Sequence, residues 1–397
     1  MASADIESAI ADGRVPAGIS AEYLEASKDA GARAGILVIF VITMIVTAAR
    51  LYARAVDPRG LVLEDYLIIL TAILFIVFIA LCLELLTLGS GRHIEYIQYV
   101  LPFSTVNATE VEDFAAHIIY TTALYICRIS GLSFYRRLCA RHPSLELAVK
   151  ISFALITAGY LPQILLIIFH CRPVTGLWPY TWQPEHAAHT CTDWGIVYLT
   201  NSIISLASDF ILFIIPIALI AIYRGSLANK IKLSVVLIPG ILVIAISITR
   251  LYLVTRGWVD PDMSWAYGPM LAIETAEIGG TVIALSAPAL KVYLGRLYQN
   301  SSLHGSSKTR TAGNRYGAGT GRGDVGTVEL DGLRRGARRE TWVGAGSGAA
   351  STEGSVKMGG EGRGSEEDLL FEGGGGRKEG GVKVTMTIAT TSEEVVR

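Results

Sequence analysis

Five charged side chains stand well inside long apolar stretches of this sequence: Arg128, Asp209, Arg250, Glu274 and Glu277. A lipid bilayer holds no water that could solvate a charge, so an ionisable group at membrane depth marks a functional-site hypothesis. Counting from the ends of the stretches places Arg128 and Asp209 at a similar depth, where an unpaired Arg costs at least about 3 kcal/mol. We therefore expect an Arg128–Asp209 ion pair, which either fixes helix register or belongs to an ion path.

The remaining charges lie nearer one end of their stretches, beside other polar side chains. Glu274 and Glu277 are three residues apart, so on a helix they share one face and can both meet Arg250. By the same depth argument, Glu84 can meet His117. A cluster of this kind, open toward one membrane surface, favours a water-filled ligand cavity over a purely structural role. The expected ligand-binding residues are Arg250, Glu274, Glu277, Trp258, Glu84 and His117.

Motifs for other kinds of chemistry are missing from the sequence. It has no HExxH, no CxxC and no GxSxG, so we do not expect an enzyme. His93, His117 and His170 with Asp113 are spaced too irregularly to predict a metal site. Retinal binding requires a Lys in the middle of the last helix, whereas Lys291 stands at the end of that stretch. We therefore expect neither a metal nor a cofactor.

Long apolar stretches are the elements that must position these side chains. The chain has 397 residues, 51% hydrophobic and only 17% charged, which is unlike a water-soluble enzyme. The stretches are long enough to span a bilayer as helices and are apolar on nearly all faces. We predict an all-α membrane protein, a bundle of seven transmembrane helices; six is the alternative, because Gly279-Gly280 and the two Glu residues interrupt the last stretch. The predicted spans are 34–55, 65–88, 114–138, 147–169, 194–222, 233–254 and 268–294.

The distribution of basic residues gives the orientation of this bundle. Lys and Arg concentrate in alternate connections, and such connections face the cytoplasm. We therefore expect the N-terminus outside and the C-terminus inside. An inner-face pair of Asp65 with Arg50 or Arg54 is expected to be structural, and the Arg54–Asp65 pairing is our preferred one. The basic connections contain Arg50, Arg54 and Arg59; Arg136, Arg137, Arg141 and Lys150; and Arg224, Lys230 and Lys232.

Two features of the connections agree with this orientation. Asn107-Ala108-Thr109 is a glycosylation sequon on a connection that it places outside, so Asn107 is a predicted glycosylation site. Cys171 and Cys191 bracket another outer connection, where disulfides persist. We expect a Cys171–Cys191 disulfide bond; the alternatives are two free thiols or pairing with another chain.

The chain divides into three parts on this basis. Residues 1–33 form a short polar extracellular N-terminus, 34–297 the transmembrane domain, and 298–397 a Gly- and Ser-rich tail. The tail cannot bury enough apolar surface to offset its ordering entropy, so we expect a disordered cytoplasmic segment. The expected partners are the lipid bilayer, an unknown extracellular small ligand, and cytoplasmic signalling partners at the basic inner loops and tail. A net charge of −1 gives no reason to expect nucleic acid.

Several short motifs resemble those of the fungal rhodopsin-domain integral membrane proteins, which include the Pth-eleven-type receptors. The matching residues are Arg50-Leu51-Tyr52-Ala53-Arg54, Leu63-Glu64-Asp65-Tyr66, Gly91-Arg92-His93, Ser133-Phe134-Tyr135-Arg136-Arg137-Leu138, Cys171-Arg172-Pro173, Trp178, Cys191, Asp209, Pro216, Arg250, Glu274 and Ser286-Ala287-Pro288-Ala289-Leu290. The resemblance spans about 35–297 and implies a seven-helix fold with a sensing role rather than light detection. The third span ends in Tyr135-Arg136-Arg137 instead of Asp-Arg-Tyr, so G-protein coupling is an extrapolation.

These inferences favour a receptor or sensor of extracellular cues in a fungus, resembling G-protein-coupled receptors and residing in the plasma membrane. The alternative is a transporter or channel that uses Arg128 and Asp209 in a proton or ion path. A third option is a scaffold that acts mainly through its tail.

Overall fold

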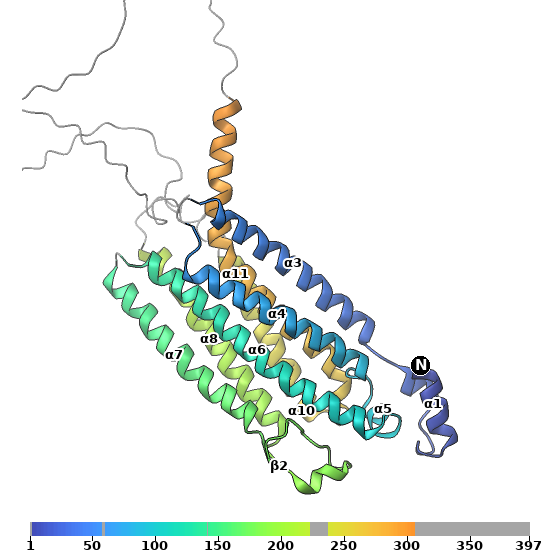
Figure 1. Ribbon diagram of the computed structural model, residues 1–397. Helices are drawn as coiled ribbons and strands as arrows, with labels where there is room; N and C mark the ends of the chain where they lie inside the picture. Colours follow the sequence, from blue (N-terminus) through green and yellow to red (C-terminus); the bar gives the residue numbers. More distant parts are fainter. Residues whose placement is uncertain (1, 58–59, 141, 223–236, 306–397) are drawn as a thin grey trace, which may run out of the picture. The chain divides into compact units, whose positions relative to one another are not determined.

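The computed structural model describes residues 2–57, 60–140, 142–222 and 237–305. Residues Met1–Leu297 fall in one compact unit. Its long helices run side by side as a bundle in Figure 1. They are α3 (Asp29–Ala55), α4 (Leu63–Leu88), α6 (Phe103–Leu138), α7 (Pro143–Ile168), α8 (Trp194–Ile222), α10 (Ile238–Val259) and α11 (Met263–Gly305).

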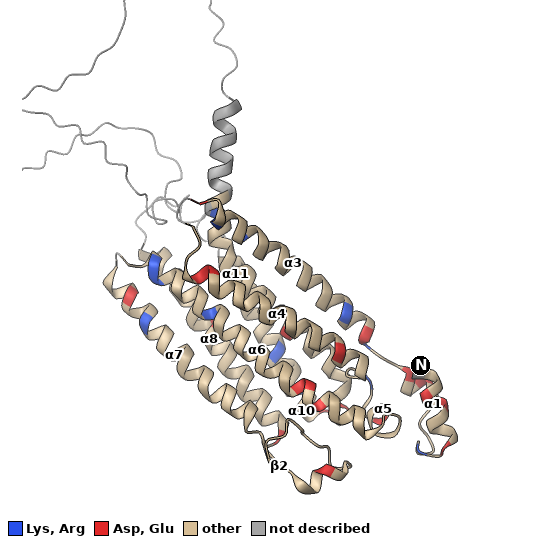
Figure 2. Cartoon of the chain, in the orientation of Figure 1, with Lys and Arg blue, Asp and Glu red and all other residues tan. Residues whose placement is uncertain are grey.

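Six of these helices are long and apolar enough to cross a membrane: α3, α4, α7, α8, α10 and the Met263–Lys291 part of α11. Each is almost free of charged residues along most of its length (Figure 2). A helix satisfies every backbone polar group internally, which is what a hydrocarbon environment demands. The protein is therefore a helical membrane protein, and the last stretch, despite its two Glu residues, is one of the six.

α6 differs from these six helices because polar residues occur throughout its length. Glu110, Glu112 and Asp113 lie in its first half, and Arg128 lies in its second. Even so, α6 packs against α4, α7 and α8. Its buried Leu124 and Leu132 belong to the main hydrophobic core. The helix with the most polar groups thus occupies a central position, where neighbouring helices can supply partners.

Apolar side chains are distributed in the manner expected of a bundle surrounded by lipid. Phe75, Phe78 and Leu271 fill the interior, together with Leu124 and Leu132. Large aliphatic side chains also cover the outer surfaces of the helices: Val41, Ile45, Leu155, Ile214 and Leu242 are all at least half exposed. Exposed apolar surface on this scale is rare on soluble monomers and suits contact with acyl chains.

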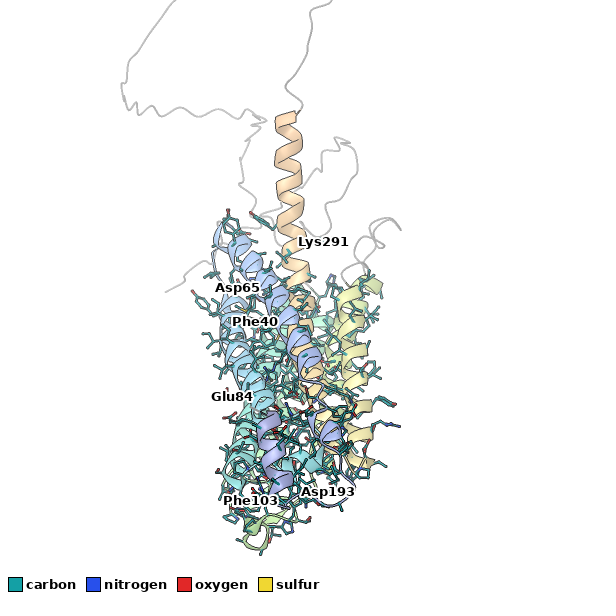
Figure 3. All side chains as sticks on the ribbon, turned by 90° about the vertical axis from the view of Figure 1, so that its right-hand side faces the viewer. Phe40, Asp65, Glu84, Phe103, Asp193 and Lys291 are labelled. Atoms are coloured by element: carbon teal, nitrogen blue, oxygen red, sulfur yellow. A yellow bond between two sulfur atoms is a disulfide. The ribbon has the colours of Figure 1, made fainter. Side chains whose placement is uncertain are left out.

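One end of the bundle carries a small disulfide-linked hairpin. β1 (Cys171–Arg172) pairs antiparallel with β2 (Thr190–Cys191), and Cys171 lies opposite Cys191 in the register. The two cysteines are bonded, which confirms the predicted disulfide. The short helix η1 (Pro184–Ala188) lies between the strands. We call this the hairpin end; Figure 3 shows Phe103 and Asp193 near it, and Asp65 and Lys291 toward the other end.

Short helices also gather at the hairpin end. The segment before α3 forms α1 (Ala2–Ala11) and α2 (Ala21–Glu25), and α5 (Ile94–Tyr99) follows α4. Ile6, Ala9 and Leu24 are buried against Tyr96 and Val100 in a separate small cluster. The N-terminal segment is therefore a folded cover over α5 rather than only a polar extension.

Several helix limits differ from the predicted spans. α6 begins at Phe103 instead of 114, so the sequon at Asn107 lies on a helix and not on a connection. α3 begins at Asp29 and α11 ends at Gly305, which extends past the predicted start of the tail. In each case, helix continues through polar residues that lie beyond the apolar stretch. The remainder of the predicted tail and the basic residues Arg224, Lys230 and Lys232 lie outside the described residues.

Candidate functional site

Arg128 and Asp209 meet in the middle of the bundle. The Nε of Arg128 donates to Asp209 Oδ1 at 3.0 Å, and its Nη2 lies 2.9 Å from the same oxygen. Asp209 Oδ2 accepts a hydrogen bond of 2.7 Å from Ser247 on α10. Both charged side chains are almost completely buried. Such a pair is held in place by its hydrogen bonds, because desolvation offsets much of its Coulombic gain.

Glu277 joins this pair to a second arginine. Its Oε2 lies 2.8 Å from Arg250 Nε and accepts a hydrogen bond of 2.7 Å from Tyr120. Its Oε1 accepts a hydrogen bond of 2.7 Å from Ser205 and lies 3.6 Å from Arg128 Nη2. α6, α8, α10 and α11 therefore contribute to one buried network of two arginines and two carboxylates, whose formal charges cancel.

Glu274 is not part of that network, although the sequence suggested that both carboxylates would meet Arg250. Its Oε1 lies 3.4 Å from Nε2 of His117 on α6, one turn closer to the hairpin end than Glu277. The opposite ring nitrogen of His117, Nδ1, lies 3.1 Å from Asp113 Oδ1. His117 thus lies between two carboxylates, one on its own helix and one on α11.

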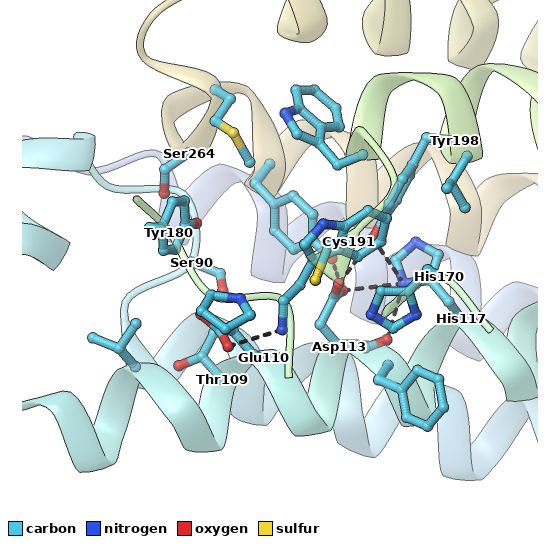
Figure 4. Close-up of a pocket in the computed structure, with 18 of the residues that line it drawn as sticks. Ser90, Thr109, Glu110, Asp113, His117, His170, Tyr180, Cys191, Tyr198 and Ser264 are labelled. Atoms are coloured by element: carbon cyan, nitrogen blue, oxygen red, sulfur yellow. Dashed lines mark hydrogen bonds and ion pairs between the residues drawn. The ribbon is translucent and has the colours of Figure 1, made fainter. Parts of the chain in front are cut away.

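A cavity of about 550 Å³ lies between His117 and the hairpin end of the bundle. This size lies within the range of cavities that hold small organic ligands. Its lining comes from the ends of α4 and α5, the first half of α6, the hairpin segment, and the starts of α8 and α11. Figure 4 shows Glu110, Asp113, His117, His170, Tyr180 and Tyr198 around it.

Asp113 is the best-connected polar group in this cavity. Its Oδ2 accepts a hydrogen bond of 2.8 Å from Tyr198 on α8, and its Oδ1 accepts one from Tyr267 on α11. Tyr198 also lies 3.3 Å from His117 Nδ1. One carboxylate therefore holds α6, α8 and α11 together at the cavity floor.

The hairpin segment closes the opposite side of the cavity. The backbone N–H of Trp178 donates to Glu110 Oε2 at 3.0 Å, which fixes the segment to α6. The Trp178 ring stacks on His170 with centroids 4.1 Å apart. Glu110 precedes the predicted 114–138 span, and burial raises the pKa of its carboxyl, while the nearby Gln183 amide and the hydrogen bond from the Trp178 backbone oppose that rise.

Only one of the six predicted ligand-binding residues, His117, lines this cavity. Arg250 and Glu277 lie deeper, in the buried network, and Glu274 contacts His117 from α11. Glu84 is exposed on α4 and forms no ion pair with His117, so this predicted contact is wrong. His117 meets Asp113 and Glu274 instead. Trp258 packs against Gly195 outside the cavity lining and is 39% exposed.

Two residues that sequence reasoning did not assign to a ligand site, Glu110 and Asp113, share a simple spacing with His117, which it did assign. Glu110, Asp113 and His117 stand at positions i, i+3 and i+7, so they occupy one face of α6. That pattern could have been found from the sequence. Trp178 and Tyr267 could not, because only the fold brings the hairpin segment and α11 to this face.

A second set of ion pairs lies at the opposite end. Arg50 Nη2 lies 3.3 Å from Asp65 Oδ1, and Arg50 Nη1 donates to the backbone oxygen of Leu285 at 2.9 Å. Arg54 lies 3.8 Å from Asp65 and 3.7 Å from Glu64. Both pairings considered for Asp65 are thus present, and Arg50 is the closer partner.

The histidines do not gather as one potential metal group. His93 lies apart from His117 and His170, with Nδ1 2.5 Å from Asp262 Oδ2. Within the described residues, His93, Glu95 and Asp262 are the set whose ligand atoms could hold an ion. Its atoms already have partners: Asp262 accepts from the Ile94 backbone, and Glu95 from Tyr23.

Comparison with known proteins agrees with the motifs noted in the sequence. A curated relative, the SAT4 family membrane protein of Emericella nidulans, is 24% identical over 237 residues, which are 57% of this chain and 56% of the relative. The chain thus matches little more than half the length of that relative. No solved structure matches it. The model of the fungal rhodopsin domain matches residues 49–296, well over half of the chain, and the chain therefore belongs to the fungal rhodopsin domain family.

Proposed function

We propose that this protein is a seven-span receptor that binds a small extracellular ligand in the cavity at its hairpin end. The observation that carries the proposal is the position of His117, which reaches Asp113 at the cavity floor and Glu274 on α11. A ligand that displaces Asp113 or Glu274 from His117 would change the electrostatic environment of Glu274 on α11. The cavity is thereby connected to the buried network deeper in the bundle.

In this proposal α6 is the seventh span, added to the six apolar ones. Its charged groups lie inside the bundle or at its ends, so lipid need not solvate them. The basic residues at Arg50, Arg54 and Arg137 favour a cytoplasmic location for that end. The hairpin end then faces the outside, where the Cys171–Cys191 disulfide is stable. A fungal plasma membrane is the location that suits an outward-facing cavity.

The signal would pass along α11. Glu274 and Glu277 stand one turn apart on this helix, so a rotation or shift that moves one moves the other. Glu277 contacts Arg250 and Arg128, and Arg50 holds the Leu285 carbonyl in the turn before Pro288. Because Pro288 cannot continue the intrahelical hydrogen bonds, this turn is a suitable place for α11 to bend. The basic inner end would then present a changed surface to cytoplasmic partners.

The test uses the full-length protein in lipid nanodiscs and a panel of small aromatic amines, alcohols and carboxylic acids. Binding is measured by thermal shift, and conformational change by hydrogen exchange at 50–57 and 135–140, at the inner end. We expect a bound compound to be lost on Trp178→Ala and to alter exchange at both inner segments. Compounds that bind in the cavity without any change at the inner end would argue against a receptor.

A transporter is the second candidate, because Asp209 also lines a small cavity of about 40 Å³ on the side away from the hairpin end. Proton passage would then run from the outer cavity through His117 and the carboxylates to Asp209. Proteoliposomes loaded with a pH-sensitive dye test this. Proton flux that Asp209→Asn abolishes would favour the transporter, and its absence favours the receptor.

A further inference from the structure

The charged side chains that line the outer cavity have one sign. Among the described lining residues there are three carboxylates, Glu110, Asp113 and Asp193, and no Lys or Arg. His117 can offset part of this charge, but it lies between Asp113 and Glu274, so one proton on its ring faces two carboxylates. Asp193 accepts from the Gly195 backbone at the start of α8. Two further histidines, His170 and His186, line the cavity. With these two neutral, the lining keeps a net negative charge even when His117 is protonated.

The lining contains buried hydrogen-bond acceptors that have no donor. Oε1 of Glu110 is buried and meets no donor with hydrogen-bond geometry. Nδ1 of His170 lies 2.6 Å from the Ile167 carbonyl, which can only accept, so Nδ1 carries the proton. Nε2 can then act as an acceptor when the ring carries a single proton; it is also without a hydrogen-bond partner, on a side chain that is 4% exposed. A buried acceptor without a donor is costly, so the cavity lacks N–H or O–H groups that a ligand could supply.

Aromatic rings provide much of the remaining surface. Phe114, Trp178, Tyr180, Trp194, Tyr198 and Tyr267 all line the cavity. The Tyr198 ring lies 6.1 Å from the Trp178 ring and 5.9 Å from the Trp194 ring, so three rings from two segments stand around one space. The faces of such rings attract cations. They also offer the apolar contact that the body of an organic ligand needs.

We propose that the outer cavity binds an organic ammonium ion, with its N–H groups on Glu110 and His170 and its apolar part against Trp178 and Tyr198. An anion would face three carboxylates, and a neutral alcohol would leave the acidic lining uncompensated. This inference rests on the proposed function only in that the ligand occupies the same cavity. It specifies the ligand's charge, which the receptor proposal leaves open.

The test compares three probes of similar shape: phenethylammonium, phenethyl alcohol and phenylacetate. Affinities are measured by calorimetry with the full-length protein in nanodiscs. We expect phenethylammonium to bind about tenfold or more tightly than the other two, the difference expected for a charged hydrogen bond. Glu110→Gln should remove most of that preference, with a much larger loss of affinity for phenethylammonium than for phenethyl alcohol. Glu112→Gln is the matched control, since it removes a charge from the same helix outside the cavity lining.

Three other results would overturn the ammonium assignment. Equal affinities for the three probes, or a preference for phenylacetate, would overturn the ammonium assignment and leave the receptor proposal standing. A preference for phenethylammonium that Glu110→Gln and Glu112→Gln weaken alike would also overturn it, because general surface charge would then explain the selectivity. Failure of all three probes to bind at millimolar concentration would overturn the assignment too, and the receptor proposal would still be judged by the hydrogen-exchange test.

Discussion

His117 Nε2 lies 3.4 Å from Glu274 Oε1, and this contact is where the outer cavity meets α11. The two residues are far apart in sequence, and both side chains are more than nine-tenths buried. The other ring nitrogen of His117, Nδ1, contacts Asp113 at the cavity floor. Movement of His117 with Glu274 would therefore also displace Asp113. In the proposed receptor, ligand binding and helix position would be coupled through one imidazole.

Neutralising Glu274 should separate binding from response. In Glu274→Gln the side chain keeps its shape but no longer pairs as a charge with His117. We expect cavity-binding compounds from the amine, alcohol and acid panel to retain their affinity, while hydrogen exchange at the inner segment 135–140 stops responding to them. Glu84→Gln, which removes an exposed carboxylate from α4, should leave both properties intact. An unchanged inner response in Glu274→Gln would mean that the signal takes another route.

The Arg128–Asp209 pair should show strong coupling in a double-mutant cycle. Arg128→Gln or Asp209→Asn alone leaves a buried charge without its partner, which costs about 3–5 kcal/mol. The double variant leaves Arg250 with Glu277, a neutral arrangement, so its loss should be smaller than the sum of the single losses. Unfolding in detergent micelles, followed by tryptophan fluorescence, measures the three stabilities. Additive losses would show that the two residues do not act as a pair.

The hairpin disulfide should stabilise the lid of the cavity as well as the fold. Cys171 and Cys191 close a segment with a sequence separation of 20, for which the chain-entropy model gives about 3 kcal/mol. The Cys171→Ser/Cys191→Ser variant should unfold at lower temperature and bind cavity ligands more weakly, because Trp178 lies on the released segment. Reducing agent should reproduce this loss in the wild type and add nothing to the variant. A variant as stable as the wild type would contradict the assignment.

Burial should make Glu110 a source of pH-dependent instability. Burial raises the folded-state pKa of this carboxyl above its unfolded value, so the folded state holds the proton more tightly. Stability from this group is full below the unfolded pKa and is lost as the pH rises through the folded pKa. Glu110→Gln should therefore raise the thermal stability near pH 7, and its advantage should vanish near about pH 4. The advantage should also shrink when an ammonium ligand is bound; an equal advantage at both pH values would exclude ionisation as its cause.

Asn107 should carry little glycan despite its sequon. Its Nδ2 donates to Glu185 at 3.0 Å and its Oδ1 accepts from Gln183 Nε2 at 3.0 Å, within the first turns of α6. A sugar on Nδ2 would disturb the contact that holds η1 to this helix. We expect glycosidase treatment of the protein from a glycosylating fungal host to leave its electrophoretic mobility unchanged. Mobility that shifts in the wild type but not in Asn107→Gln would show that the site is used and that η1 adapts.

The bundle itself was predictable because apolar length and loop charge are local properties of a sequence. Depth counting was enough to suggest that Arg128 and Asp209 meet, since few partners exist at one depth in an apolar bundle. The same counting misplaced Glu84, because depth says nothing about the direction in which a side chain points around the helix axis. It also treated Glu274 and Glu277 as equivalent, although one turn of α11 gives them different partners: His117 for Glu274, and Arg250 and Tyr120 for Glu277.

Sequence alone therefore determined the membrane class and the existence of the long helices, and it favoured the disulfide and the buried charges that the structure shows. The tertiary structure decided which charges share a partner, and it alone assembled the cavity. Trp178, Tyr198 and Tyr267 come from three separate segments, and each has an ordinary local sequence environment. They become a site only when packing brings α6, α8, α11 and the hairpin to one place, because recognition depends on distances between side chains that no local pattern encodes.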